Sequence, residues 1–124
     1  MDFVTAVKTC FGKFATFEGR AARSEYWFFT LFLVLGSLVL TTLDIVLGIG
    51  VLSTIFSLII LIPSVAVSVR RLHDTDRSGW WYLLFFIPLI GAIVLIIWFC
   101  TRGNAGANRF GADPLAAAPA LPAA

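Results

Sequence analysis

Charged side chains are scarce in this 124-residue chain, and they are unevenly distributed. Nine basic and seven acidic residues carry all of the formal charge. Two long blocks, residues 26–69 and 80–101, together hold one charged residue, Asp44. A soluble domain of this size needs charged faces on most of its helices, and about a quarter of its residues are charged. The composition therefore excludes a soluble domain and indicates a small integral membrane protein, with one domain expected over residues 1–114.

Cysteine and histidine are also rare, and the net charge is low. Two cysteines and one histidine cannot supply a disulfide framework or the three or four ligands of a zinc site. A formal charge of +2 is too small for a nucleic-acid-binding protein, whose basic residues gather in a stripe. We therefore expect no metal, no cofactor and no nucleic-acid partner.

Two apolar segments in the middle of the chain are each long enough to cross a bilayer. About 20 apolar residues span ~30 Å of hydrocarbon, and residues 26–43 and 51–69 approach this length. A turn is expected around residues 44–50, since one helix through both segments would be about 66 Å long. Ser24 is the expected N-cap of the first helix, and Pro63 is expected to kink the second.

The third apolar segment, residues 80–100, allows two interpretations. It contains no charged residue, and Ser78 is expected to cap its first turn. Our first interpretation is a single transmembrane helix kinked near Pro88 and Gly91, which predicts an all-α bundle of three transmembrane helices. The alternative is a re-entrant hairpin of two half-helices, whose exposed backbone would need protein cover and whose two ends lie on one side of the membrane.

The N-terminal segment has the pattern of an amphipathic helix that precedes the first span. Apolar residues recur at helical spacing at Phe3, Val7, Phe11 and Phe14, and the lysines lie off this stripe. Such a helix lies in the membrane interface or packs its stripe on the bundle, and the sequence leaves both open. A turn is expected after it, at Gly19.

The positions of the basic residues indicate the orientation in the membrane. Three spans with a cytoplasmic N-terminus place seven basic residues inside and two, Arg102 and Arg109, outside, which agrees with the positive-inside rule. The hairpin alternative brings the C-terminal segment inside as well and leaves no basic residue outside. The last residues, 115–124, contain only Leu, Ala and Pro and are expected to form a disordered end.

The densest polar segment, residues 70–79, lies between the second and third apolar segments. On a helix, Arg70 and Asp74 form an i,i+4 pair, and Arg70 and Arg71 lie near anionic head groups. These arginines are interpreted either as a solvated anchor that fixes topology or as a site that binds phosphate. A second polar segment, residues 18–25, is expected to form weak, exposed ion pairs. Its charged members are Glu18, Arg20, Arg23 and Glu25.

Single residues offer little evidence of chemistry. His73, the one histidine, is expected to form a capping or other hydrogen bond beside Asp74 instead of binding metal. Asp44 is expected to be a solvated residue of the turn instead of a transport residue. No nucleophile–base pair, phosphate-binding loop or pair of carboxylates occurs, and Ser64 and Ser68 suit helix packing. We therefore expect no enzymatic activity.

Three motifs, in this order along the chain, resemble those of a bacterial family. They are residues 17–27 (FEGRAARSEYW), 70–81 (RRLHDTDRSGWW) and 106–114 (GANRFGADP). With them the chain is similar, over residues 1–114, to the small inner-membrane proteins called domain of unknown function 805. The resemblance implies a helical, multi-pass protein of the bacterial inner membrane and no agreed biochemical activity. It also implies that residues 106–114 form an ordered turn instead of a linker.

The predicted function is non-enzymatic binding at the cytoplasmic face. The expected partners are lipid head groups, a second copy of the chain or another membrane protein; the alternative is an oligomeric small-solute or ion transporter or channel component. If residues 106–114 lay on the same side as residues 70–79, the motifs could form one polar site; with three spans the membrane separates them. The candidate binding residues are Arg20, Arg23, Arg70, Arg71, His73, Asp74, Arg77, Asn108, Arg109 and Asp113.

Overall fold

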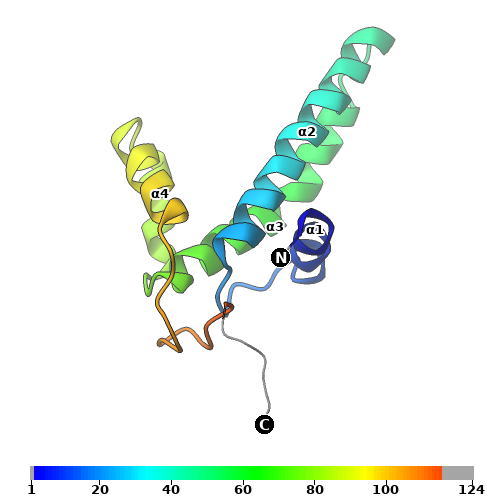
Figure 1. Cartoon of the computed structure of the whole chain (residues 1–124). Helices are drawn as coiled ribbons and strands as arrows, with labels where there is room; N and C mark the ends of the chain where they lie inside the picture. The colour runs from blue at the N-terminus through cyan, green and yellow to red at the C-terminus, as the bar shows by residue number, and fades with distance from the viewer. Residues whose placement is uncertain (1, 116–124) are drawn as a thin grey trace.

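The computed structural model describes residues 2–115, and within this range the fold is all-α, as predicted. The elements in order are α1 (Phe3–Gly12), α2 (Arg23–Leu47), α3 (Leu52–Asp74), the 3-10 helix η1 (Gly79–Phe86) and α4 (Ile90–Cys100). They form a V: α2 and α3 make a long arm, η1 and α4 make a short arm, and α1 lies beside the junction (Figure 1). Most of the expected disordered end, residues 116–124, lies outside the described residues.

The long arm is an antiparallel helix pair that is long enough to cross a membrane. Its helices contain 25 and 23 residues, which correspond to about 37 and 34 Å. Both are candidate membrane spans by length and composition. Pro63 lies inside α3, where helix continues on both sides of it. Much of the apolar surface of the pair is exposed, including Leu38, Val39, Ile45, Val46 and Leu58.

Asp44 is not the solvated turn residue that was predicted. The helix α2 continues to Leu47, so Asp44 lies in its last turn and is only 4% exposed. Its carboxylate accepts hydrogen bonds from the backbone N–H groups of Leu52 and Ser53, both at 3.0 Å, and from the Ser53 hydroxyl at 2.6 Å. These N–H groups at the start of α3 would otherwise lack partners. Asp44 therefore caps α3 from the neighbouring helix.

Only one of the two predicted N-caps is found. The helix α2 begins at Arg23 with Ala22 as its N-cap, and Ser24 lies inside the helix, so the prediction for Ser24 was wrong. Ala22 makes no side-chain capping bond. Ser78 does cap η1, because its hydroxyl accepts a hydrogen bond from Trp80 N at 3.3 Å.

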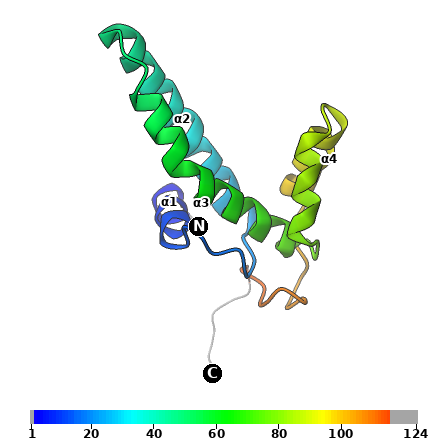
Figure 2. The ribbon, with the colours of Figure 1, turned by 180° about the vertical axis from the view of Figure 1, so that it is seen from behind.

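The third apolar segment is a hairpin, so its interpretation as one kinked helix was wrong. Helix η1 ends at Phe86, the chain turns through residues 87–89, and α4 returns beside η1 (Figure 2). Trp81 of η1 and Trp98 of α4 pack edge to face within the short arm, with ring centroids 5.7 Å apart. Pro88 lacks the N–H group that a continuing helix needs. Both ends of the segment therefore lie at the base of the V, as in the hairpin alternative.

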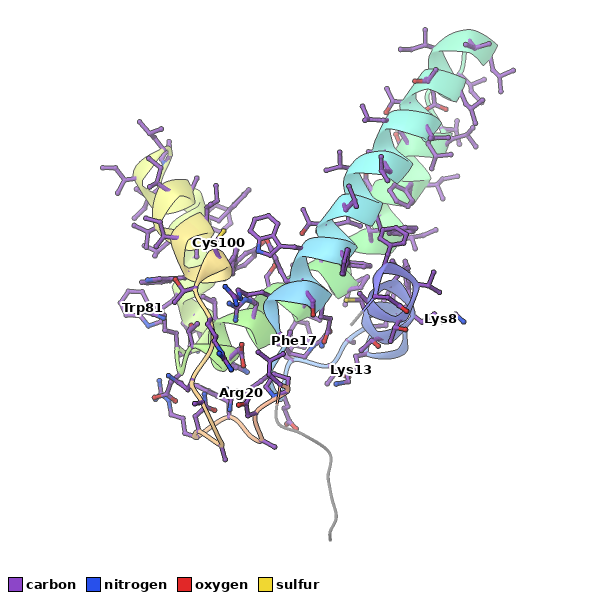
Figure 3. All side chains as sticks on the ribbon, in the orientation of Figure 1. Lys8, Lys13, Phe17, Arg20, Trp81 and Cys100 are labelled. Carbon is purple, nitrogen blue, oxygen red and sulfur yellow. The ribbon has the colours of Figure 1, made fainter. Side chains whose placement is uncertain are left out.

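The N-terminal helix α1 packs its apolar stripe on the bundle. Ala6 and Cys10 are buried, and Phe11 packs edge to face on Phe29 of α2, with ring centroids 5.6 Å apart. The turn expected at Gly19 is present, with a positive φ of 88°. The exposed residues of α1 and of the segment that follows it include Val4, Lys8 and Lys13 (Figure 3).

Candidate functional site

Buried charged residues from the first two motifs, residues 17–27 and 70–81, meet where the two arms join. We define the arginine knot as Arg20, Glu25, Arg70, Arg71 and Asp74, each of which is 6% exposed or less. Arg20 lies at the base, next to the C-terminal segment (Figure 3). Buried ions are stable only when they are paired and hydrogen-bonded, so the pairing within the knot decides what these residues do.

Asp74 is the centre of the knot because its carboxylate pairs with two arginines. Oδ1 accepts a hydrogen bond from Arg20 Nε at 2.9 Å, and Oδ2 accepts one from Arg71 Nη1 at 2.8 Å. The predicted i,i+4 pair of Arg70 and Asp74 is therefore wrong. The chain at Gly103 passes so close that a Cβ atom there would lie 2.0 Å from Asp74 Oδ2.

Arg70 forms a second buried pair, with Glu25 of α2. Its Nη1 donates to Glu25 Oε2, and the thiol of Cys10 lies 3.7 Å from the same oxygen. Ala21 N also donates to Arg70 O at 2.9 Å. The predictions of exposed pairs around residues 18–25 and of a solvated Arg70–Arg71 anchor were therefore wrong. Burial, followed by the charge of Glu25, raises the pKa of the Cys10 thiol to about 12, which leaves the thiol unreactive near neutral pH.

The C-terminal segment is an ordered turn that binds to the knot. The Arg20 guanidinium donates to the backbone oxygens of Asn104 and Gly106, both at 2.6 Å. Asn108 Nδ2 donates to His73 O at 2.9 Å, and Asn108 and Gly111 form an isolated β-bridge. The turn therefore lies on the same side as residues 70–79, and the separation of the motifs in the three-span arrangement was wrong.

Arginines from the long arm also hold the end of the hairpin. The last turn of α4 has no basic residue of its own, although the free carbonyls of a helix C-terminus attract cations. Arg71 Nε donates to Phe99 O at 3.1 Å, and Arg71 Nη2 donates to Thr101 O. Arg23 Nη1 donates to Cys100 O at 3.1 Å. The angle between the two arms is thus fixed by side chains that cap α4 from outside.

His73 has the hydrogen-bonding role expected for it. Its Nδ1 lies 2.9 Å from Gly19 O, and because a carbonyl oxygen only accepts, Nδ1 carries the proton. The imidazole ring stacks on Phe110 of the C-terminal turn, with centroids 4.0 Å apart and planes 2° from parallel. His73 therefore joins the turn before α2 to the turn after α4. Within residues 2–115 no cluster of three His, Cys, Asp or Glu residues is placed to hold a metal ion.

Three further predicted site residues lie outside the knot, Arg109 exposed and Arg77 and Asp113 half-buried. Arg109 Nε pairs with Asp76 Oδ1 at 3.1 Å in an exposed ion pair. Asp113 accepts backbone hydrogen bonds from Leu115 and Gly106, and these hold its pKa below the ordinary value. Its contribution to the turn is therefore present above the ordinary pKa and is lost as the pH falls through the lowered one. The Arg77 guanidinium lies 4.2 Å from the ring centroid of Trp98.

Arg23, one of the predicted site residues, lines a pocket. The pocket has a volume of about 420 Å³ and is lined by Arg23, Ser24, Trp27, Phe28 and Cys100. The side chain of Arg23 is exposed and one of its hydrogen bonds goes to Cys100 O. A planar guanidinium has five N–H donors, so it retains donors for an anionic group.

Sequence reasoning missed two features of the site. Glu25 was assigned to an exposed pair, although a carboxylate at the start of a long apolar segment indicates a buried partner elsewhere in the chain. Gly103 was not considered, and only its contact with Asp74 reveals its role. Much of the knot is bonded to backbone carbonyls, which no residue type in the sequence identifies.

Comparison with known proteins agrees with the motif resemblance. Residues 14–112 match the family described as "Protein of unknown function (DUF805)". The inner membrane protein YhaI of Escherichia coli K12 is 48% identical over 100 residues, which cover 79% of this chain and 85% of YhaI. The inner membrane protein YhaH of the same strain is 49% identical over 104 residues, covering 79% of this chain and 86% of YhaH.

A third relative is less similar to the chain than YhaI and YhaH are. The uncharacterized protein YiiR of Escherichia coli K12 is 32% identical over 90 residues, covering 72% of this chain and 56% of YiiR. No solved structure matches the chain. The names of YhaI and YhaH give a location, the inner membrane, and no activity.

Proposed function

This chain belongs to the DUF805 family and is an inner-membrane protein, and from that premise we propose that it binds anionic phospholipid head groups at its cytoplasmic face. The binding is non-enzymatic and depends on Arg23. The observation that carries this proposal is the exposed guanidinium of Arg23 at a pocket of about 420 Å³ with aromatic walls.

The proposal includes a topology with two membrane-spanning helices, α2 and α3. The short arm enters the membrane from the cytoplasmic side and returns to it. Every lysine and arginine of the chain lies in the N-terminal segment, in residues 70–77 or in residues 102–109, and the loop at residues 48–51 has none. Because the N- and C-terminal segments meet at the same base, the positive-inside rule assigns that base to the cytoplasm.

The topology predicts which surface cysteines an impermeant thiol reagent reaches. In a Cys100→Ser background, Cys10 needs no replacement because it is buried and its pKa is raised to about 12. A cysteine replacing Ala112 in the C-terminal turn is expected to react only after lysis. A cysteine replacing Gly50 in the exposed loop is expected to react in intact cells. Labelling of Ala112→Cys in intact cells would contradict the two-span topology.

The arginine that a lipid can reach in the structure is not one of the pair predicted from the sequence to bind it, Arg70 and Arg71. The side chains of Arg20, Arg70 and Arg71 are 0% exposed and their charges are paired inside the protein. Binding through Arg70 and Arg71, as predicted from the sequence, therefore has no support. Arg23 differs because its exposed guanidinium faces the pocket at the start of α2.

The surroundings of Arg23 suit a phosphate at the membrane interface. Trp27 and Phe28 form part of the pocket wall, and aromatic rings of this kind are enriched at the level of the head groups. Arg binds phosphate through two parallel N–H bonds. Ser24 adds a hydroxyl group to the same pocket. One basic residue near an anionic surface contributes about 1 kcal/mol to lipid binding.

The test is retention of lipid by the full chain in mild detergent, measured by native mass spectrometry with phosphatidylglycerol or phosphatidylcholine. The wild-type protein is expected to retain phosphatidylglycerol preferentially. Arg23→Gln is expected to weaken this preference about fivefold, the equivalent of about 1 kcal/mol. The matched control is Arg102→Gln, because Arg102 is exposed but lines no part of the pocket. An equal loss in both variants would exclude a specific site at Arg23.

The transporter or channel alternative receives less support from the long arm. A solute pathway needs hydroxyl groups that face a common path, yet six of the hydroxyls in the spans donate to backbone carbonyls four residues earlier in the chain. These hydroxyls belong to Thr30, Thr42, Thr54, Ser57, Ser64 and Ser68. Such groups are satisfied locally and suit a lipid-facing helix pair.

A further inference from the structure

The two arms reach to different depths from one base. The long arm measures about 34–37 Å, which is enough to cross the hydrocarbon core. The eight residues of η1 and the eleven of α4 each correspond to about 16 Å, which is half of that core. Figures 1 and 2 show the arms diverging from the base, where α1 also lies.

The short arm has the surface of a segment embedded in hydrocarbon. Phe86 and Ile90 at its tip are 77% and 68% exposed, and apolar residues continue along both of its helices. Arg71 of α3 and Arg23 of α2 hold the carbonyls at the end of α4, so the short arm is joined to the long arm at the base and diverges from it above (Figure 1). In the two-span topology proposed above, lipid chains of the cytoplasmic leaflet surround the short arm.

We infer that the protein is a wedge, wider in the cytoplasmic leaflet than in the opposite leaflet. Its preferred partner is a membrane whose cytoplasmic surface is convex. The inference rests on the two-span topology proposed above. The cytoplasmic leaflet contains α2, α3, η1 and α4, with α1 at its surface, while the opposite leaflet contains only the distal parts of α2 and α3. The protein therefore occupies more area in the cytoplasmic leaflet than in the opposite one.

The physical basis of the preference is the packing of lipids in a curved leaflet. In a strongly convex leaflet the head groups are spread apart and apolar gaps open between them, so segments that enter only that leaflet bind more strongly. The two helices of the short arm, η1 and α4, fill such gaps. In a flat membrane they must push apart lipids that are already close-packed. The same protein is thus accommodated at lower free energy where the cytoplasmic leaflet is convex.

The test compares small sonicated vesicles with large extruded vesicles of one lipid composition. The full chain, carrying Ala112→Cys in the Cys100→Ser background, is reconstituted into a mixture of both vesicles, and external thiol labelling counts only the molecules whose base faces outward. We expect these molecules to be severalfold denser per unit of lipid in the small vesicles. Equal densities in the two populations would overturn the wedge.

Two matched double variants assign the preference to the short arm. Phe86→Lys with Ile90→Lys places two charges at the hairpin tip, which draws the tip out of the hydrocarbon and is expected to abolish the preference for small vesicles. Ile45→Lys with Val46→Lys places the same charges at the far end of α2, where both residues are exposed, and is expected to keep it. A preference that survives in the tip variant would overturn the assignment.

Two further measurements distinguish a wrong wedge proposal from unfolding of the variant and from a wrong topology. An unreactive Cys10 in the tip variant shows that α1 still covers the knot, so a lost preference is then not caused by unfolding. The intact-cell labelling of Ala112→Cys and Gly50→Cys tests the topology independently of vesicle size. Since vesicles of uncharged lipid suffice for the size comparison, a lack of phosphatidylglycerol binding at Arg23 leaves this test unaffected.

Discussion

Asp74→Asn is expected to lower the free energy of unfolding by about 3–5 kcal/mol, because it removes the one carboxylate that the guanidinium groups of Arg20 and Arg71 share. Both arginines are 0% exposed at their side chains and would remain buried without an anionic partner. The side-chain amide that replaces the carboxylate also points its own N–H group at a guanidinium N–H group of Arg20 or Arg71. The loss therefore combines a missing attraction with an unpaired buried charge.

Asp76→Asn is the matched control for this substitution. It makes the same chemical change two residues along the chain, at a pair with Arg109 whose side chains are 46% and 61% exposed. Exposed ion pairs contribute about 0–1 kcal/mol, and asparagine tolerates the positive φ of 60° at this position. Asp76→Asn is therefore expected to change stability by less than about 1 kcal/mol.

Both variants are measured by denaturant unfolding in the same detergent, with α-helical circular dichroism as the signal. The midpoint is expected to fall strongly for Asp74→Asn and little for Asp76→Asn. In addition, Cys10, which is unreactive in the folded protein, is expected to react at lower denaturant concentration in Asp74→Asn. Equal stabilities of the two variants would show that Asp74 does not hold the knot together.

Gly91→Ala is expected to destabilise the protein by about 1–3 kcal/mol, the usual cost of forcing an extra methyl group into a packed contact. A Cβ atom at Gly91 of α4 would lie 1.7 Å from Leu84 O, a backbone atom of η1 in the same hairpin, and 3.1 Å from Ile87 Cβ. A backbone oxygen cannot rotate away, so η1 and α4 would have to separate.

The sign of this effect distinguishes the hairpin from a single kinked helix. In a continuous helix, alanine would replace glycine with a gain of about 1 kcal/mol. The control is Gly12→Ala at the end of α1, where nothing lies within 4 Å of an added Cβ. It is expected to be neutral or slightly stabilising. Unfolding midpoints of both variants in detergent provide the measurement, and stabilisation by Gly91→Ala would exclude the close approach of η1 and α4.

The positions of the long helices could be predicted from the sequence because they depend on local composition. Apolar segments of sufficient length, bounded by polar residues, indicated both spans, and the observed helices are only slightly longer than predicted at most of their ends. The cap at Ser78 also depends on neighbouring residues, whereas the hydrogen bond of His73 reaches Gly19, 54 positions away. In contrast, the sequence favoured a kinked helix over a hairpin at Pro88, and the pattern could not correct this because both structures begin with the same break in hydrogen bonding.

The sequence alone determined that this is a helical membrane protein with its polar residues gathered in three motifs. The hydrophobicity and the length of the apolar segments suffice for that conclusion. Only the tertiary structure decided how the polar residues pair. Glu25 and Arg70 are 45 positions apart and Arg20 and Asp74 are 54 apart, so no local spacing relates them. Once buried, each charge must find an opposite charge or a backbone carbonyl, and the packing of the helices fixes which one lies within reach.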